Sequence, residues 1–249
     1  GGPELRALAE ALETMRDRLE GRDYVERYVH TLTHEMKSPL AAIAGAAELL
    51  QDELPAARRE RFAALIAGEA GRLQRLVDRL LALATVEQRR EPQERRPVSL
   101  QRAAEELLAS RAPAIARKDL RIDQRIPDNA TVLGEPFLLV QAIGNLLDNA
   151  LEFTPTQGAV TLDAEPAGDA WRLTVTNSGG MIPDYARDRL FERFYSLPRP
   201  DTGQKSTGLG LAFVREVAQL HGGTITVDNL PNPDGSIAGV IACLSLPTG

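Results

Sequence analysis

Hydrophobic residues recur every three or four positions over three segments in the first third of the chain. This spacing predicts three amphipathic helices. In the first segment the spacings of three and four alternate, which is typical of a parallel coiled coil. We therefore assign residues 1–21 to a coiled coil, with a monomeric amphipathic helix as the alternative because the seam is short. The apolar positions are Leu5, Leu8, Leu12, Met15 and Leu19; Leu32, Met36, Leu40, Ile43, Ala47 and Leu50; and Phe62, Ile66, Ala70, Leu73, Leu76 or Val77, Leu80 and Leu83.

A turn at residues 52–55 joins the second and third predicted helices into a hairpin. A hairpin by itself would leave its apolar seam in water, so two copies are expected to pair as a four-helix bundle. We assign residues 22–90 to this dimeric bundle. The charged stretch that follows has no periodicity and contains Pro92 and Pro97, which predicts a linker at residues 91–98.

The pattern changes from about Ser99 onward, where segments of helical period alternate with segments of period two. The mixture predicts an α+β domain over residues 99–249, an α/β sandwich whose mixed sheet carries helices on one face. The expected helices cover residues 100–117, 135–152, 185–194 and 209–221. The expected strands cover residues 120–126, 160–164, 171–175, 225–227 and 240–246.

The 249 residues suit two modest domains, and 43% hydrophobic residues with only 4% aromatic residues favour helical cores of Leu, Ala and Val. The net charge is −6 and the basic residues are scattered in pairs, which argues against nucleic acid as a partner. A single cysteine, Cys243, excludes an internal disulfide and a multi-cysteine metal site. No run reaches the roughly 18–20 apolar residues that cross a bilayer.

The second predicted helix contains a histidine that should face water. His34 lies two positions after Leu32, and at about 100° per residue it points about 200° away from the apolar stripe. Glu35 lies beside it, and Pro39 follows one turn later, where a proline bends a helix at a cost of about 3 kcal/mol. An exposed histidine and acid are by themselves most often solvated side chains without a role, but a kink so close to them indicates a local function.

Two further patterns suggest a phosphate site. Asn145 and Asn149 are four residues apart, so both amides project from one helix face and could offer oxygens to a hydrated magnesium ion. Residues 206–211, STGLGL, place glycines where a helix begins, and the backbone N–H groups at such an end can hold phosphate. Taken alone, the asparagines could be ordinary helix surface and the glycines an ordinary turn.

In combination these segments resemble the sensor histidine kinases over nearly the whole chain from about residue 25. The H-box of that family is matched by His34, Glu35, Lys37, Ser38, Pro39 and Leu40. Residues 145–150 resemble the N-box, 177–183 the G1-box, 191–194 the F-box and 208–211 the G2-box, in the order of the family.

The resemblance implies a HisKA-type phosphotransfer domain followed by a HATPase_c domain that binds ATP and Mg²⁺. His34 would accept the γ-phosphoryl group and pass it to an aspartate of a response regulator, with Glu35 as the orienting acid and Ser38 acting in dephosphorylation of the regulator. Asn149 and Asn145 would hold the magnesium ion. The implied ATP-binding residues are Asn145, Asn149, Phe153, Asn177, Gly179, Ile182, Lys205, Thr207, Gly208, Leu209 and Gly210. Residues 184–207 would form a mobile lid, and His221 would be structural.

The chain departs from the family pattern at two places. Where many relatives have a Lys or Arg and then Tyr, Glu152 and Phe153 follow Leu151, so a phosphate-facing cation is missing from the N-box. In the G1-box, Asn177 replaces the adenine-facing aspartate and Met181 replaces a glycine, which adds a side chain and disfavours positive φ. These changes predict weakened ATP binding.

Three functions therefore remain. The chain fits the catalytic portion of a dimeric sensor histidine kinase; a pseudokinase that acts as a scaffold or phosphatase is the main alternative. A stand-alone ATPase of the gyrase/Hsp90 type would not need His34 and Pro39 on a bundle helix. Gly1 and Gly2 resemble a cloning remnant, so we expect a membrane anchor upstream and place this portion in the bacterial cytoplasm, below an inner-membrane sensor.

Overall fold

The computed structural model describes residues 32–33, 35–52, 54–201, 203, 205–232 and 235–248. The predicted coiled coil at residues 1–21, residues 22–31 of the predicted bundle and His34 lie outside these residues. The chain divides into two compact units, one up to Val77 and one from Asp78 to Gly249, which are described separately. In the described part of the chain, no helix combines the length and the apolar composition that crossing a bilayer requires.

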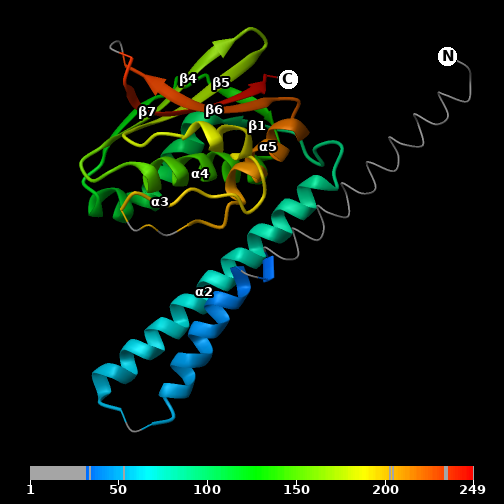
Figure 1. Cartoon of the computed structure of the whole chain (residues 1–249). Helices are drawn as coiled ribbons and strands as arrows, with labels where there is room; N and C mark the ends of the chain where they lie inside the picture. Colours follow the sequence, from blue (N-terminus) through cyan, green and yellow to red (C-terminus); the bar gives the residue numbers. More distant parts are fainter. Residues whose placement is uncertain are drawn as a thin grey trace, which may run out of the picture. The chain divides into compact units, whose positions relative to one another are not determined.

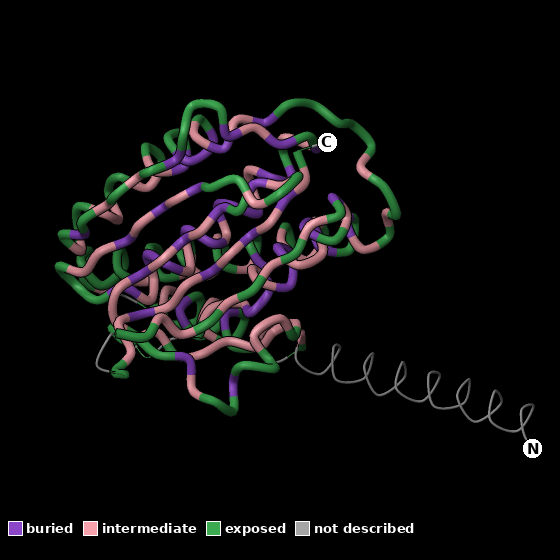
Figure 2. Tube along the Cα trace, turned by 90° about the horizontal axis from the view of Figure 1, so that it is seen from above, coloured by how far each residue is buried: buried purple, intermediate pink, exposed green. Residues whose placement is uncertain are grey.

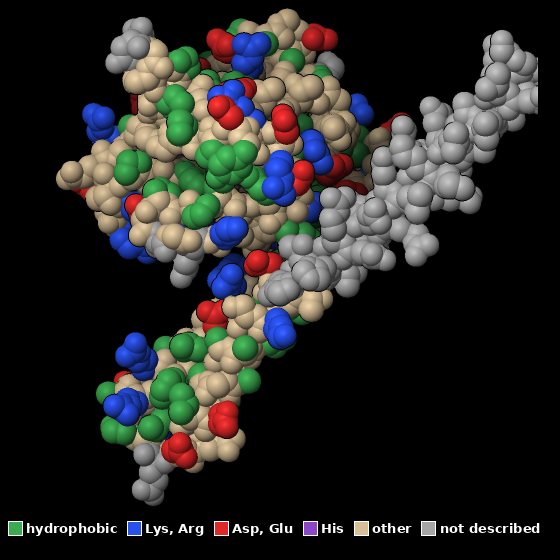
Figure 3. Space-filling model, viewed as in Figure 1, with side chains coloured by type: hydrophobic (Ala, Val, Ile, Leu, Met, Phe, Trp, Pro, Cys, Tyr) green, Lys and Arg blue, Asp and Glu red, His purple; other side chains and the backbone are tan. Residues whose placement is uncertain are grey.

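The first unit is a helical hairpin. Its described helical residues 35–49 are followed by α2 (Ala56–Glu87), whose last turns belong to the second unit (Figure 1). Pro39 and Ala46 are buried, whereas Leu40 and Ala47 of the predicted stripe are exposed. The hairpin therefore covers only part of its apolar surface. Large apolar side chains remain exposed on it (Figure 3), namely Leu40 (49%), Leu49 (46%), Leu65 (41%) and Val77 (38%).

The second unit is built on a five-stranded mixed sheet of order β2-β4-β5-β7-β6. Only the β2/β4 pair is parallel. Burial alternates along β4 and β5 because successive side chains point to opposite faces of a sheet. Figure 2 shows buried and less buried stretches following one another along the chain. The strands are β2 (Arg121–Arg125), β4 (Ala159–Ala167), β5 (Ala170–Ser178), β6 (Thr224–Pro231) and β7 (Ile237–Pro247).

Three helices cover one face of this sheet (Figure 1): α3 (Leu100–Arg117), α4 (Pro136–Phe153) and α5 (Gly210–Leu220). Ser99 caps α3 by accepting a hydrogen bond from the N–H of Arg102 at 3.3 Å. Leu139, Ile143 and Leu147 of α4 are fully buried in the core, and each fully buried side chain of this size contributes about 1.5–3 kcal/mol. The predicted sandwich, with helices on one face of a mixed sheet, is confirmed.

Two local expectations were wrong. Part of the predicted linker is a strand, β1 (Arg96–Ser99), which pairs antiparallel with β3 (Thr131–Gly134). Strands of four residues are too short for their alternation to stand out. The expected helix at residues 185–194 is only a 3-10 helix, η1 (Asp184–Arg189), and the chain then turns, with Phe194 at φ +62°.

His221 joins the end of α5 to the beginning of α4. Its Nδ1–H donates to the carbonyl oxygen of Val217 at 2.8 Å, and its Nε2 accepts from the N–H of Glu135 at 3.0 Å. The ring lies so close to Gly134 that a Cβ on that residue would be 2.4 Å from the imidazole Cδ2. Burial lowers the pKa of His221 below its ordinary value of 6.5, so the neutral ring is the form that fits this joint.

This joint predicts a pH dependence of stability. Because the unfolded chain binds the proton of His221 at higher pH than the folded chain does, the free energy of unfolding should fall as the pH drops below about 6.5. His221→Asn should lower the free energy of unfolding by about 1–3 kcal/mol at pH 8 and show a shallower slope below pH 6.5. Urea unfolding followed by fluorescence of Trp171, which is buried in the second unit, measures both. Identical slopes in the two proteins would contradict this role.

Candidate functional site

A cavity opens in the second unit beside the last two turns of α4. Asn149 and Phe153 face it from α4, and Asn177 faces it from the end of β5. The segment before α5 and the first turn of α5 close its other side. Its further lining residues are Leu146, Ala150, Val175, Gly180, Met181, Ile182, Leu190, Tyr195, Ser196, Leu197, Ser206, Gly208, Gly210, Leu211, Val227, Val240 and Ala242. The lining is mostly apolar with a few convergent polar groups, as is typical of a small-molecule site.

Asn177 is the most buried polar side chain of this cavity, with 5% of its surface exposed. Its Nδ2 donates to the carbonyl oxygen of Gly179 at 3.2 Å, so the opposite atom, Oδ1, is the acceptor left for a ligand. Met181 does not need the positive φ that its side chain disfavours: the positive φ angles fall on Gly179 (+69°) and Gly180 (+75°), and Met181 is not among the described residues with positive φ. Its side chain is 59% exposed.

The residue after Met181 is held by a partner that sequence reasoning missed. The N–H of Ile182 donates to Asn229 Oδ1 at 2.7 Å, and Asn229 Nδ2 donates to the carbonyl oxygen of Ile182 at 2.9 Å. The two residues are 47 positions apart, and a single asparagine on a strand carries no local signal of such a pairing. This reciprocal pair fixes the backbone where it leaves the cavity.

Gly208 allows the chain to pass very close to itself before α5. Its φ is +64°, and a Cβ there would lie 2.4 Å from the carbonyl carbon of Phe194. In the described structure no side chain caps the N-terminus of α5, and its first turn contains no acidic residue. The N–H groups of that turn are therefore available to an anion at the cavity.

Comparison with known proteins agrees with this site. Residues 24–89 match the His Kinase A (phospho-acceptor) domain, and residues 134–248 match the histidine kinase-, DNA gyrase B- and HSP90-like ATPase domain. The sensor protein CreC of Escherichia coli is 47% identical over 246 residues, which cover 99% of this chain and 50% of CreC. The chain belongs to the sensor histidine kinases. It spans about half the length of the curated relatives that it matches.

Two solved histidine kinases extend the comparison. ShkA, solved full-length in complex with AMPPNP, is 25% identical with a TM-score of 0.62, over 90% of this chain and 46% of ShkA. ThkA, solved in complex with the response regulator protein TrrA, is 21% identical with a TM-score of 0.71, over 96% of this chain and 66% of that one. The second likeness shows the fold alone.

Only some of the expected ATP-binding residues of this sensor histidine kinase line the cavity. Asn149, Phe153, Asn177, Ile182, Gly208 and Gly210 do; Asn145, Gly179, Lys205, Thr207 and Leu209 do not. Asn145 is nevertheless close, since its Oδ1 lies 3.7 Å from where a Cβ of Gly210 would be. Lys205 is exposed and pairs with Pro198 in a β-bridge. Leu209 is a core residue, 1% exposed.

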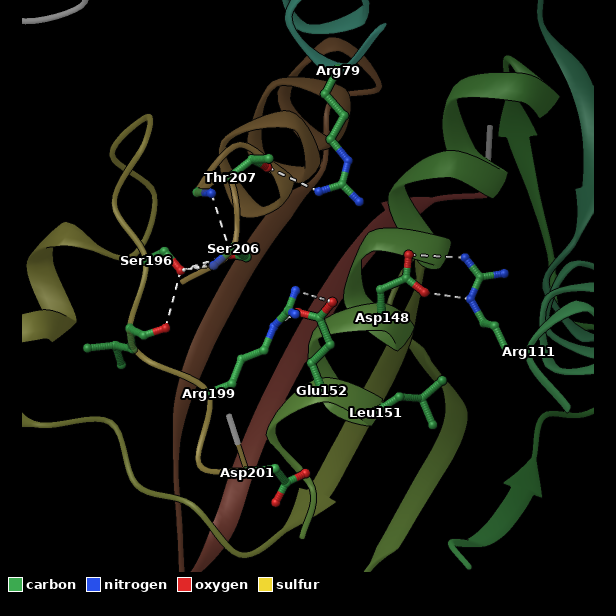
Figure 4. A network of polar contacts seen from close by, with 12 residues as sticks. Arg79, Arg111, Asp148, Leu151, Glu152, Ser196, Arg199, Asp201, Ser206 and Thr207 are labelled. Carbon is green, nitrogen blue, oxygen red and sulfur yellow. Dashed lines mark hydrogen bonds and ion pairs between the residues drawn. The ribbon is translucent and has the colours of Figure 1, made fainter. Parts of the chain in front are cut away.

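Thr207 has an unexpected partner. Its Oγ1 accepts a hydrogen bond from Arg79 Nη1 at 3.1 Å, where Arg79 lies in the part of α2 that belongs to the second unit (Figure 4). Next to it, Ser206 donates its N–H to Ser196 Oγ at 3.0 Å. These contacts fasten the approach to α5 on two sides.

In the first unit, Glu35 and Ser38 of the H-box differ in their surroundings. Glu35 is half-buried and lies 3.8 Å from Arg72 Nη2, measured from its Oε2. Ser38 is exposed to solvent. The hydroxyl of Ser38 is therefore accessible to a partner protein, whereas the carboxylate of Glu35 forms an ion pair with Arg72.

The G1-box departures predict separable effects on nucleotide affinity. Asn177→Asp should strengthen ATP binding about five- to tenfold, because a carboxylate accepts a stronger hydrogen bond from an adenine amino group than an amide does. Met181→Gly should change the affinity less than about twofold, since an exposed side chain with ordinary backbone leaves little to relieve. Calorimetric titration with ATP measures both. No gain in the Asn177→Asp protein would mean that the amide serves the cavity equally well.

Proposed function

We propose that the chain catalyses transfer of the γ-phosphoryl group of ATP to His34, and then to an aspartate of a response regulator. The observation that carries this proposal is the cavity that brings Asn149, Asn177 and the uncapped N-terminus of α5 together. A neutral imidazole is a nucleophile near pH 7 when its attacking nitrogen carries no proton. Glu35 would accept a hydrogen bond from the other ring nitrogen and so fix the tautomer.

The residues present fit a nucleotide. Asn177 Oδ1 would accept from the adenine amino group, Phe153 would pack against the base, and the first turn of α5 would bind phosphate. Magnesium would offset the phosphate charge, held by Asn149 with Asn145 close by. Among the described residues no three acidic, histidine or cysteine side chains gather around a metal position. One or two amide oxygens, from Asn149 and Asn145, suit Mg²⁺ because this ion keeps most of its water ligands.

We further propose that two copies of the chain pair through the hairpin as a four-helix bundle. The exposed Leu40, Leu49 and Leu65 support this, because pairing would remove apolar surface from water. The domain limits 1–21, 22–90, 91–98 and 99–249 stay part of the proposal, with Pro39 and residues 91–95, the part of the linker before β1, as the places that allow movement. The proposal also includes a membrane anchor upstream and a cytoplasmic position for this portion at the inner membrane.

Dephosphorylation of the regulator is a second candidate activity, and the exposure of Ser38 favours it. The serine is four residues after His34, one helical turn along the same face, where its hydroxyl could position water against a phospho-aspartate. A protein that retained this activity with a weakened ATP site would act as a phosphatase or scaffold rather than as a kinase.

The kinase activity is tested at its nucleophile. The protein incubated with labelled ATP and Mg²⁺ should carry an acid-labile, base-stable phosphoryl group, and His34→Gln should remove at least about 99% of the label because the nucleophile is gone. His30→Gln, four residues earlier in the sequence, is the matched control and should be labelled normally. Undiminished labelling of a dimeric His34→Gln protein would refute the assignment.

Ser38→Ala tests the second activity. Dephosphorylation of a phosphorylated receiver domain should slow about tenfold or more, while labelling of His34 changes less than about twofold, because the alanine removes only a hydroxyl. Both rates are measured on the same preparation, with circular dichroism as a check of folding. Equal loss of both activities would indicate damage to the bundle instead.

A further inference from the structure

Two ion pairs hold the lid segment, residues 184–207: Arg199 binds Glu152 in the last turn of α4, and Asp201 binds Lys118, which follows the last residue of α3. Arg199 binds Glu152 through both oxygens of the carboxylate, with Nε–Oε2 at 3.0 Å and Nη2–Oε1 at 2.6 Å. Asp201 Oδ2 lies 2.7 Å from Lys118 Nζ. The same Nζ donates to the carbonyl oxygens of Leu151 and Glu152, both at 3.0 Å.

Glu152 occupies the N-box position at which many relatives carry a cation. The N-box carries no cation of its own, but a guanidinium from the lid segment lies at this end of α4, bound to the acid that replaces the cation. Figure 4 shows Arg199 reaching toward Glu152, while Asp148, one turn earlier on α4, points toward Arg111.

This ion pair lies beside the candidate nucleotide site. Phe153 follows Glu152 and lines the cavity, and Leu197, two residues before Arg199, lines it as well. Ser196 Oγ accepts a hydrogen bond from the N–H of Ser206, which lies shortly before the first turn of α5. The guanidinium is thus carried by a segment that is held at the C-terminal end of α4 and, through Ser206, near the first turn of α5.

The pair can exchange partners. The side chains of Arg199 and Glu152 are 28% and 33% exposed, and a partly solvated ion pair is stabilised only weakly against separation. Guanidinium groups bind phosphate with the same two-point geometry that they use for carboxylate. The multiple charges of a triphosphate make it the stronger competitor for a single cation.

Resting on the function proposed above, we propose that Arg199 is the phosphate-binding cation of this site and that Glu152 holds it until a nucleotide phosphate displaces the carboxylate. Glu152 is then a positioning residue whose carboxylate competes with the nucleotide. The charge reversal on α4 does not remove the cation from the site but moves it to the lid segment, and couples the lid segment to phosphate binding.

The two members of the pair are therefore expected to have opposite effects on affinity. In calorimetric titrations of the full chain, Arg199→Gln should weaken ATP binding about five- to twentyfold, and Arg199→Lys should lie between it and the unchanged protein. Glu152→Gln should tighten ATP binding about two- to fivefold because the competing carboxylate is gone. If the ion pair only shaped the lid segment, both variants would weaken binding together.

Ligands without phosphate separate the two explanations further. Adenosine, measured by displacement of a fluorescent nucleotide analogue, should bind equally to the unchanged protein and to Arg199→Gln, whereas ADP and ATP should not. Asp148→Asn is the matched control: it breaks the Arg111 pair, with Nε–Oδ1 at 2.6 Å, one turn earlier on the same helix, and should leave ATP affinity within about twofold.

Several outcomes would overturn the proposal. These are unchanged ATP affinity in Arg199→Gln, unchanged or weaker affinity in Glu152→Gln, or a loss in Lys205→Gln that Arg199→Gln lacks, which would make Lys205 the phosphate cation. In each case a chain that still binds ATP keeps its proposed function. A correctly folded, unsubstituted chain that binds no ATP would refute both proposals.

Discussion

The packing of α4 against the sheet determines where the site residues of the second unit lie. Leu139, Ile143 and Leu147 are buried in the core, which fixes the rotation of the helix about its axis. Asn149 and Phe153 then face the cavity, and the acids on the remaining face meet cations of other segments. A helix with a less completely buried face could rotate about its axis, and Asn149 and Phe153 would then no longer face the cavity.

The two ends of α4 are held by different means. At its beginning the backbone N–H of Glu135 is bound by the buried ring of His221, so the start of α4 depends on the end of α5. At its end, Lys118 Nζ donates to carbonyl oxygens that the helix leaves without partners. The lid segment is held there by Asp201, which binds Lys118, and by Arg199, which binds Glu152. The helix that carries the site thus connects the rigid core to the segment expected to respond to nucleotide.

The structure shows how each departure from the family pattern affects the candidate ATP site. Met181 causes no backbone strain, because the neighbouring glycines take the positive φ angles. Asn177 uses its amide nitrogen internally and keeps an acceptor for a ligand. Glu152 is paired with Arg199, so its charge does not repel an approaching anion unopposed. Each departure is less damaging to an ATP site than the residue identities alone suggest, which weakens the case for a pseudokinase.

The sequence by itself determined α2 to α5, the long strands and the residue types of the site, but not the short β1 or the 3-10 helix η1. The limits of α3 and α5 follow from periodicity, from the Ser99 cap and from a glycine at the helix start, and all of these act over a few residues. Only the tertiary structure decided which distant groups meet. Arg199 with Glu152 and Asn229 with Ile182 are each joined across 47 positions, and His221 reaches Glu135 across 86. Local patterns carry no information on such pairs, because their contact depends on how whole elements pack and not on the spacing of neighbouring residues.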